Sequence, residues 1–346
     1  MNAAPTARPT PFPKAVSFFR RHPVLLLLCF SPGIVEYLSG SSSFEGIVRA
    51  PFLFLLFLGF NLGLYGPGVL LVREAIVRWK KGWASLICLG AAYGLLEEGT
   101  ALSTLFDPTA SVVGGLGYYG HYLGVSWIWV IGVLEIHAVV SIGIPILLLG
   151  LALPETRGRP LLTGRQPGIA LGIFAFDIVL LAYVSHYYPV GFFLQLFAVL
   201  VAGGLAYLAY RLPPGILDPT SEHPCVGRGA SLLLGLAFYP ILLLVPAIGG
   251  TVHAPAPLTG VVDVALSGGL FFVVRRVIGR SHNEPELILL ILGALIPILA
   301  FGFIAQIFLP IVLVGDLLFA LFFYSLWRRY ATARGGPPTV VPAGAT

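Results

Sequence analysis

Apolar segments, each about as long as a bilayer-crossing helix, recur along the whole chain. One crossing takes roughly 20 residues, because the hydrocarbon core is about 30 Å thick and an α-helix rises about 1.5 Å per residue. Ten segments satisfy this requirement: 23–39, 50–72, 83–106, 124–153, 167–188, 190–210, 230–249, 256–274, 287–308 and 310–327. With 57% hydrophobic residues, 10% charged residues and a mean hydropathy of +0.93, the chain is too apolar for a water-soluble globule. The sequence therefore predicts an all-α, polytopic transmembrane helix bundle of about ten spans.

The distribution of basic residues predicts which loops face the cytoplasm. Lys and Arg in short loops stay on the cytoplasmic side during membrane insertion. They precede the first predicted span and follow the second, fourth, sixth, eighth and tenth, and of the 20 basic residues only Arg49 falls on the opposite side. Both termini are therefore expected in the cytoplasm. The net charge of +5 is explained by this topology, so we expect the lipid bilayer as partner and no nucleic acid.

The predicted organisation has three parts. Residues 1–22 form a cytoplasmic N-terminal tail, 23–330 a single transmembrane helical domain, and 331–346 a disordered cytoplasmic C-terminal tail rich in Pro, Gly, Ala and Thr. The segment from Val24 has no small-residue cleavage site after it, so it is expected to remain as an anchor. The chain is expected to be a multi-pass protein of the plasma (inner) membrane.

Two adjacent acids, Glu97 and Glu98, interrupt the third predicted span. An ionised carboxylate at mid-bilayer depth costs roughly 2.5–3.5 kcal/mol on insertion scales, so such residues face the bundle interior or trapped water. Seven of the 15 acidic residues fall inside predicted spans, which contain no Lys or Arg. These acids must be protonated, bridged by a cation or hydrated, which favours a polar cavity that opens outward.

The fourth predicted span carries the matching imidazole, His137. If Trp127 marks the outer interface, His137 lies roughly 15 Å deep, and Glu97, nine residues inside Phe106, lies about 13 Å deep. The two spans are consecutive and antiparallel, so this shared depth permits a carboxylate–imidazole contact. Glu135 is turned about 200° away from His137 on a regular helix. The candidate accessory polar residues of the cavity are Asn61, Glu135 and Asp177.

Paired carboxylates with an imidazole support several chemistries. One carboxylate can take a proton from water while its neighbour shares a proton, because like charges close together disfavour two ionised groups. The imidazole can then orient the water or stabilise an oxyanion. The same groups would also suit zinc or manganese, or relay protons in a transporter.

The Glu97-Glu98 pair, followed about forty residues later by His137, resembles the CAAX protease and bacteriocin-processing (CPBP) family of intramembrane glutamic proteases. That family pairs Glu-Glu-x-x-x-Arg on one helix with Phe-x-x-x-His on the next, followed by a later His with Asn or Asp four residues on. The resemblance implies that Glu97 activates water and that His137 assists.

The chain departs from this pattern at three positions. Leu102 stands in place of the Arg, Val133 in place of the Phe, and Val190 lies four residues after His186, where the family has Asn or Asp. The similarity covers the third to fifth spans, about 100 residues, and ten spans exceed the family's usual eight.

Three functional hypotheses follow. The first is a membrane-embedded hydrolase acting on a peptide, with Glu97 as general base, Glu98 as its proton-sharing partner and His137 as polarising group. The second is a proton- or cation-coupled carrier in which the same carboxylates bind a small ion. The third is a non-catalytic membrane scaffold. Convergence of the three side chains within hydrogen-bonding distance would favour hydrolysis, whereas wider spacing along a polar path lined by Asn61 and Asp177 would favour transport.

Overall fold

The computed structural model describes residues 13–42, 46–184, 188–281, 283–305 and 310–331, and it is built almost entirely of helices. The first half contains α1 (Pro13–Arg21), α2 (Pro23–Pro32), η1 (Gly33–Leu38), α3 (Gly46–Arg49), α4 (Pro51–Trp79), α5 (Trp83–Gly94), η2 (Leu95–Ala101), η3 (Gly114–Gly117), β1 (His121–Tyr122), β2 (Val125–Ser126), α6 (Trp127–Ile136), η4 (His137–Gly143) and α7 (Ile144–Ala152). The second half contains η5 (Pro154–Thr156), α8 (Gln166–Val184), α9 (Phe192–Arg211), α10 (Arg228–Leu236), α11 (Phe238–Thr251), α12 (Ala256–Val277), α13 (Glu284–Ala305) and α14 (Pro310–Ala331).

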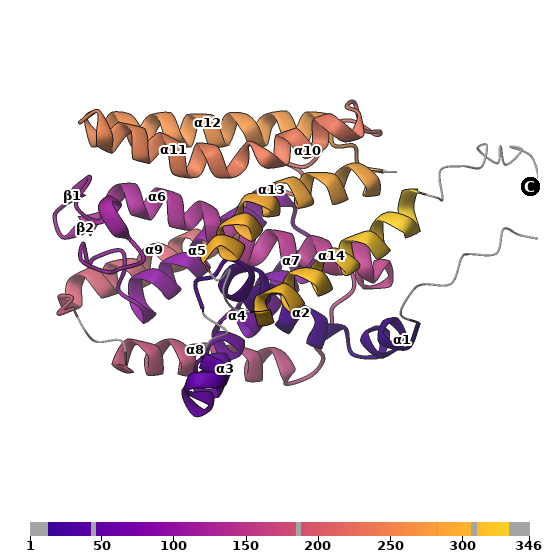
Figure 1. Cartoon of the computed structure of the whole chain (residues 1–346), viewed down its shortest axis with the longest axis horizontal. Coiled ribbons are helices and arrows are strands. Elements are labelled where there is room, and N and C mark those ends of the chain that lie inside the picture. The colour runs from indigo at the N-terminus through magenta and orange to yellow at the C-terminus, as the bar shows by residue number, and fades with distance from the viewer. Residues whose placement is uncertain (1–12, 43–45, 185–187, 282, 306–309, 332–346) are drawn as a thin grey trace, which may run out of the picture.

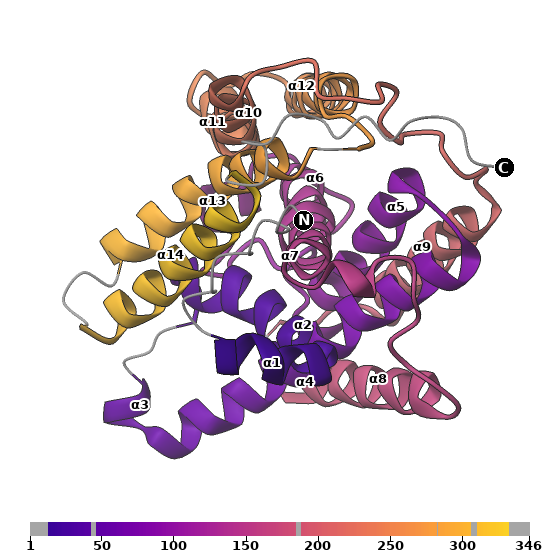
Figure 2. The same ribbon diagram turned by 90° about the vertical axis from the view of Figure 1, so that its right-hand side faces the viewer.

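The helices form a bundle whose middle is made by α2, α5, α6 and α7 (Figures 1 and 2). Helices α11 and α12 lie side by side along one edge, and α8 lies along the opposite edge against α4. Helix α1 and the end of α14 lie at the same end of the bundle, whereas the β1–β2 hairpin lies at the other end (Figure 1).

The predicted all-α membrane bundle is confirmed. Seven helices of the described chain are long and apolar enough to cross a membrane: Pro51–Trp79, Trp127–Ala152, Gln166–Val184, Phe192–Arg211, Arg228–Thr251, Ala256–Val277 and Glu284–Ile304. The remaining three predicted spans also correspond to helical segments, at Pro23–Leu38, 83–101 and Pro310–Ala331. Within the predicted N-terminal tail 1–22, residues Pro13–Arg21 form helix α1, and residues 1–12 lie outside the described residues. Of the predicted C-terminal tail 331–346, residues 332–346 lie outside them.

The predicted end of the second span was wrong. Helix α4 continues to Trp79, so Arg73, expected in a cytoplasmic loop, lies within the helix and is only 4% exposed. Its guanidinium contacts Glu74 at 2.9 Å and donates to the carbonyl oxygens of Thr156 and Arg159 at 2.5 and 2.8 Å. These partners replace the water that a loop arginine would have had, and therefore permit its burial.

The predicted end of the third span was also wrong. The helix stops at Ala101 and not at Phe106, because Ser103 takes a left-handed backbone conformation with φ of 62°. A tight turn follows, in which the Phe106 N–H donates to the Ser103 carbonyl oxygen at 3.0 Å. The turn leads the chain back toward the acidic pair.

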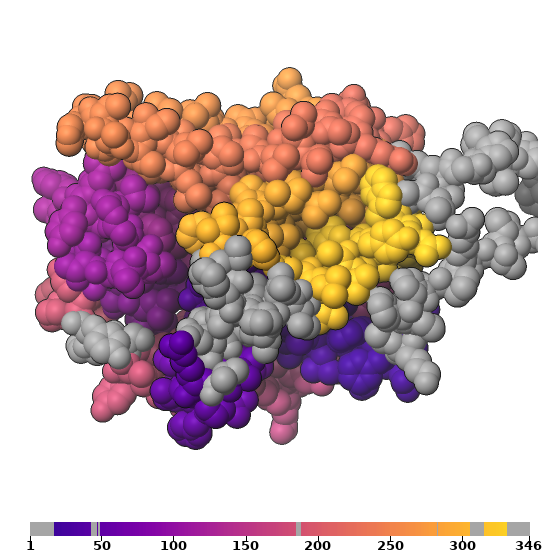
Figure 3. Space-filling model, in the orientation of Figure 1, coloured from indigo at the N-terminus to yellow at the C-terminus, as the bar shows by residue number. Residues whose placement is uncertain are grey.

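Apolar side chains pack between the helices and also cover the outside of the bundle. Leu27, Leu149 and Ile288 are at most 1% exposed, whereas Phe176 on α8 and Phe193 on α9 are 66% and 82% exposed. Exposed aromatic residues on the outer helices suit contact with lipid tails, while the helices satisfy their own backbone groups. The atoms of the C-terminal helices cover the upper part of the bundle in the space-filling view (Figure 3).

A close helix contact places the two halves of the acidic site next to each other. A Cβ atom on Gly90 of α5 would lie 2.6 Å from the Ala138 Cα of η4, and one on Gly94 would lie 3.0 Å from the His137 Cβ. Glycine at these positions lets two helices approach more closely than any larger residue would allow. Helix α5 leads directly into η2, so this contact sets the distance between the acids and the imidazole.

Candidate functional site

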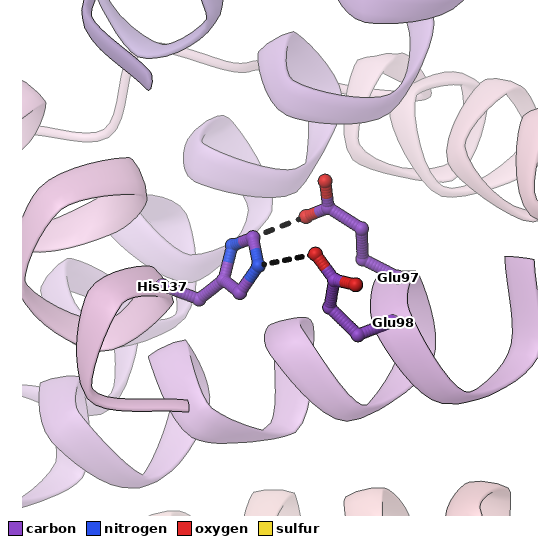
Figure 4. A group of neighbouring side chains, drawn as sticks. All are labelled: Glu97, Glu98 and His137. Carbon is purple, nitrogen blue, oxygen red and sulfur yellow. Dashed lines mark hydrogen bonds and ion pairs between the residues drawn. The ribbon is translucent and has the colours of Figure 1, made fainter. Parts of the chain in front are cut away.

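Two π-helical segments supply the three predicted site residues. Glu97 and Glu98 lie on η2, which continues α5, and His137 is the first residue of η4, which continues α6. Both carboxyl groups point toward the imidazole ring from the neighbouring helix (Figure 4). π-Helical turns inside α-helices are rare and are frequently found at functional sites.

The imidazole bridges the two carboxyl groups. His137 Nε2 lies 3.1 Å from Glu98 Oε1, and Nδ1 lies 3.2 Å from Glu97 Oε2 and 3.0 Å from the Ser141 Oγ. Glu97, His137 and Glu98 are 1%, 2% and 8% exposed. In such a dry environment the electrostatic attraction between an imidazolium and a carboxylate is stronger than in water.

The two acids differ in how completely they are held. Glu98 has a partner at each oxygen, because the Thr104 hydroxyl donates to Oε2 while His137 faces Oε1. Thr104 in turn accepts a hydrogen bond of 3.1 Å from the Trp129 Nε1–H. Glu97 Oε2 is buried; it faces His137 Nδ1 as an ion pair, but it accepts no hydrogen bond within the part of the chain that the structure describes. Glu98 is therefore anchored, and Glu97 keeps an acceptor for a further group.

Two tyrosines enclose the imidazole. The Tyr65 ring of α4 is stacked on the His137 ring with centroids 6.5 Å apart, and the Tyr93 ring is tilted against it at 5.7 Å. Both tyrosine hydroxyls neighbour the Glu97 side chain, and both side chains are 3% exposed. The rings exclude bulk water and restrict the imidazole to one orientation.

The three accessory candidates lie apart from this group. Glu135 accepts a hydrogen bond of 2.7 Å from the Ser267 hydroxyl of α12, as its opposite position on the helix implies. Asp177 lies against Gly63, where α8 packs on α4. Asn61 donates to Tyr37 and Ser42 at 3.3 and 3.2 Å. Of the three, Asn61 alone is connected to the site. The connection runs through Ser42 and Glu36 to the Tyr65 hydroxyl.

Four residues of the site were not predicted: Ser141, Thr104, Tyr65 and Tyr93. Ser141 had a usable signal, because it follows His137 by four residues and therefore lies on the same helix face. Thr104 had none, because it reaches Glu98 only through the turn after Ala101. Tyr93 had the same kind of signal as Ser141, because it precedes Glu97 by four residues on the continuous helix of α5 and η2. Tyr65 resembles an ordinary core aromatic residue, and only the packing of α4 brings its hydroxyl to Glu97.

The same three residues could hold a metal ion. Each offers one ligand atom, and the three atoms lie within 4.8 Å of one another. Carboxylate oxygens and imidazole nitrogen are ligands of zinc, whose catalytic sites combine three protein ligands with water. The ligand types fit, and Glu97 Oε2, which accepts no hydrogen bond from the described residues, offers lone pairs for a metal ion.

Comparison with known proteins gives a family but no characterised relative. No curated protein and no solved structure shows significant similarity to the chain. The sequence profile of an uncharacterized membrane protein family matches residues 25–334, which include every helix from α4 to α14 and all the site residues described above. The chain therefore belongs to this uncharacterized membrane protein family.

Proposed function

We propose that the chain is an intramembrane hydrolase of the plasma (inner) membrane that cleaves peptide bonds with a water activated by Glu97. The observation that carries this proposal is the convergence of Glu97, Glu98 and His137, with one ligand atom of each within 4.8 Å of the others, around a buried Glu97 oxygen that faces His137 but accepts no hydrogen bond from the described residues. The Glu-Glu and His elements that resemble the CPBP glutamic proteases support the same assignment.

Each side chain has a separate role in this mechanism. Glu97 Oε2 accepts a proton from water, and the resulting hydroxide adds to the peptide carbonyl carbon. Once Glu97 Oε2 is protonated, His137 Nδ1–H, which faces this oxygen at 3.2 Å, donates a hydrogen bond to the developing oxyanion. Glu98 is held by Thr104 and faces Nε2, so it fixes the imidazole and shares its proton. The proton on Glu97 then passes to the leaving amine, which restores the base.

The carrier hypothesis has less support. It requires polar groups along a continuous path to the acidic pair. Asn61 connects to that pair through Ser42, Glu36 and Tyr65, but Glu135 bonds to Ser267 of α12 and Asp177 packs against Gly63. A scaffold without activity would not need three titratable residues buried together, because buried charged groups cost more than apolar residues of similar volume.

A cleavage assay tests the proposal. Purified protein in lipid vesicles is incubated with a library of randomised peptides, and new amino termini are quantified by mass spectrometry. We expect cleavage by the wild type and a loss of at least 100-fold with Glu97→Gln, since general base catalysis contributes roughly 10²–10⁴-fold. Glu135→Gln is the matched control, because Glu135 is also a carboxylate within a membrane helix but lies outside the site.

Full cleavage by the Glu97→Gln protein would rule out Glu97 as base. Cleavage that survives prolonged chelation supports direct activation of water by Glu97. Loss on chelation with recovery on adding Zn²⁺ would instead assign the water to a metal held by the same residues. If peptides stay intact but a proton gradient drives ion uptake into the vesicles, the carrier hypothesis replaces the hydrolase.

A further inference from the structure

A third carboxylate, Glu36, shares the structural setting of the site residues. Among the described residues, π-helical turns occur in η1, η2 and η4, and each contains a titratable residue: the partly buried Glu36, the buried acidic pair, and the buried His137. Segments of this kind are concentrated at functional sites. The coincidence suggests a role for Glu36 in the same site.

Glu36 is connected to Glu97 through Tyr65. The Tyr65 hydroxyl donates to Glu36 Oε1 at 2.7 Å, and the Ser42 hydroxyl donates to Oε2 at 2.6 Å. The same Tyr65 hydroxyl lies close to the Glu97 side chain, and its ring packs against His137. Asn61 donates to the Ser42 oxygen at 3.2 Å and so holds the far side of the chain of polar groups.

The direction of these bonds follows from the number of hydrogens. A phenol has one proton, and Tyr65 gives it to Glu36. The Tyr65 oxygen therefore faces Glu97 with its lone pairs, as an acceptor. Glu97 Oε2 faces His137 Nδ1 at 3.2 Å but receives no hydrogen bond from the described residues, so it is an acceptor as well. Two acceptors side by side match the two O–H groups of one water molecule.

We propose that Glu36 is a positioning residue that, by fixing the Tyr65 hydroxyl, orients the attacking water. Glu97 receives one O–H of this water and the Tyr65 oxygen receives the other, which aims the water's lone pair toward the substrate. Without Glu36, the Tyr65 hydroxyl donates its proton to the Glu97 carboxylate instead. This hydrogen bond takes the lone pair that should accept the water proton, and it competes with His137 for the same carboxylate. The inference rests on the proposed function for its catalytic consequence, but its structural consequence at His137 does not.

A double-mutant cycle tests this link. Glu36→Leu and Tyr65→Phe are each expected to lower kcat roughly fivefold or more, the factor that corresponds to one hydrogen bond, with KM unchanged. Glu36→Gln retains a carbonyl acceptor for Tyr65 and is expected to keep most of the activity. In the Tyr65→Phe background, Glu36→Leu should have no further effect on kcat, because the hydroxyl that it controls is gone.

The same cycle is followed without any substrate by nuclear magnetic resonance of the imidazole nitrogens, with the His137 signal assigned by its loss in His137→Gln. We expect Glu36→Leu to shift this signal in the wild-type background and not in the Tyr65→Phe background, and we expect Glu135→Gln to leave it unchanged. Additive effects of the two substitutions, or a His137 signal insensitive to Glu36→Leu, would overturn the inference. Because this readout needs no cleavage, it separates failure of the inference from failure of the proposed hydrolysis.

Discussion

The close contact between α5 and η4 predicts that a single added methyl group at Gly90 disables the site from a distance. In Gly90→Ala, the new Cβ would lie 2.6 Å from the Ala138 Cα and 3.1 Å from its Cβ. Ordinary carbon contacts are about 3.5–4.0 Å, so the two helices must separate by roughly 1 Å.

The separation acts directly on the acid–imidazole contacts. His137 Nε2 lies 3.1 Å from Glu98 Oε1, and an increase of roughly 1 Å would take this pair beyond the range of a hydrogen bond. A misplacement of about 1 Å in a catalytic site costs on the order of 100-fold in rate. Overpacking should also reduce the free energy of unfolding by about 1–3 kcal/mol.

The assays are peptide cleavage, the His137 imidazole signal and thermal unfolding in the same lipid. Gly172→Ala is the matched control, because a Cβ on Gly172 of α8 would meet no atom within 4 Å. This control should be neutral or stabilised by about 0.5–1 kcal/mol, since alanine is the better helix former. If Gly90→Ala keeps the cleavage rate and the His137 signal of the control, close packing does not set the site geometry.

Three further predictions follow from single contacts. Arg73→Ala should reduce the free energy of unfolding by about 3–5 kcal/mol, because it leaves Glu74 without its buried partner. Arg78→Ala removes the half-exposed partner of the same carboxylate and should reduce the free energy of unfolding by less than about 1 kcal/mol. Equal losses for the two variants in chemical denaturation would contradict this prediction. Ser141→Ala should slow cleavage roughly fivefold with little effect on unfolding, because it removes a hydrogen-bond partner of His137 Nδ1; an unchanged rate would show that Ser141 does not fix the ring. Asp263→Leu should raise the free energy of unfolding by about 1–3 kcal/mol, because both carboxylate oxygens of Asp263 are buried without hydrogen bonds to the described residues. A melting temperature below that of the wild type would refute this prediction.

The fold and the site core were predictable from sequence for simple reasons. Span number depends on apolar length, and the common depth of Glu97 and His137 depends only on the helical rise. Both quantities are insensitive to side-chain packing. The opposite placement of Glu135 followed from the same periodicity, and the structure directs that residue to Ser267 of α12.

The remaining features depend on tertiary contacts that no sequence pattern encodes. The end of the third span depends on the left-handed conformation of Ser103, a residue that is not specialised for it. The end of the second depends on partners for Arg73 that lie more than 80 residues away. A π-helical turn has no sequence periodicity of its own, so the local geometry of Glu97 and His137 could not be predicted.

The three π-helical turns explain how adjacent residues can serve one site. Neighbouring residues on a regular helix point about 100° apart, so Glu97 and Glu98 would ordinarily face different helices. In η2 both carboxyl groups instead reach the same imidazole, one at each ring nitrogen. The π-helical turn thus allows the two carboxyl groups to converge, and the tight packing at Gly90 and Gly94 holds the turn in place. Stability at α5 and chemistry at η2 are therefore coupled, so substitutions that loosen the helix contact should reduce activity before they unfold the bundle.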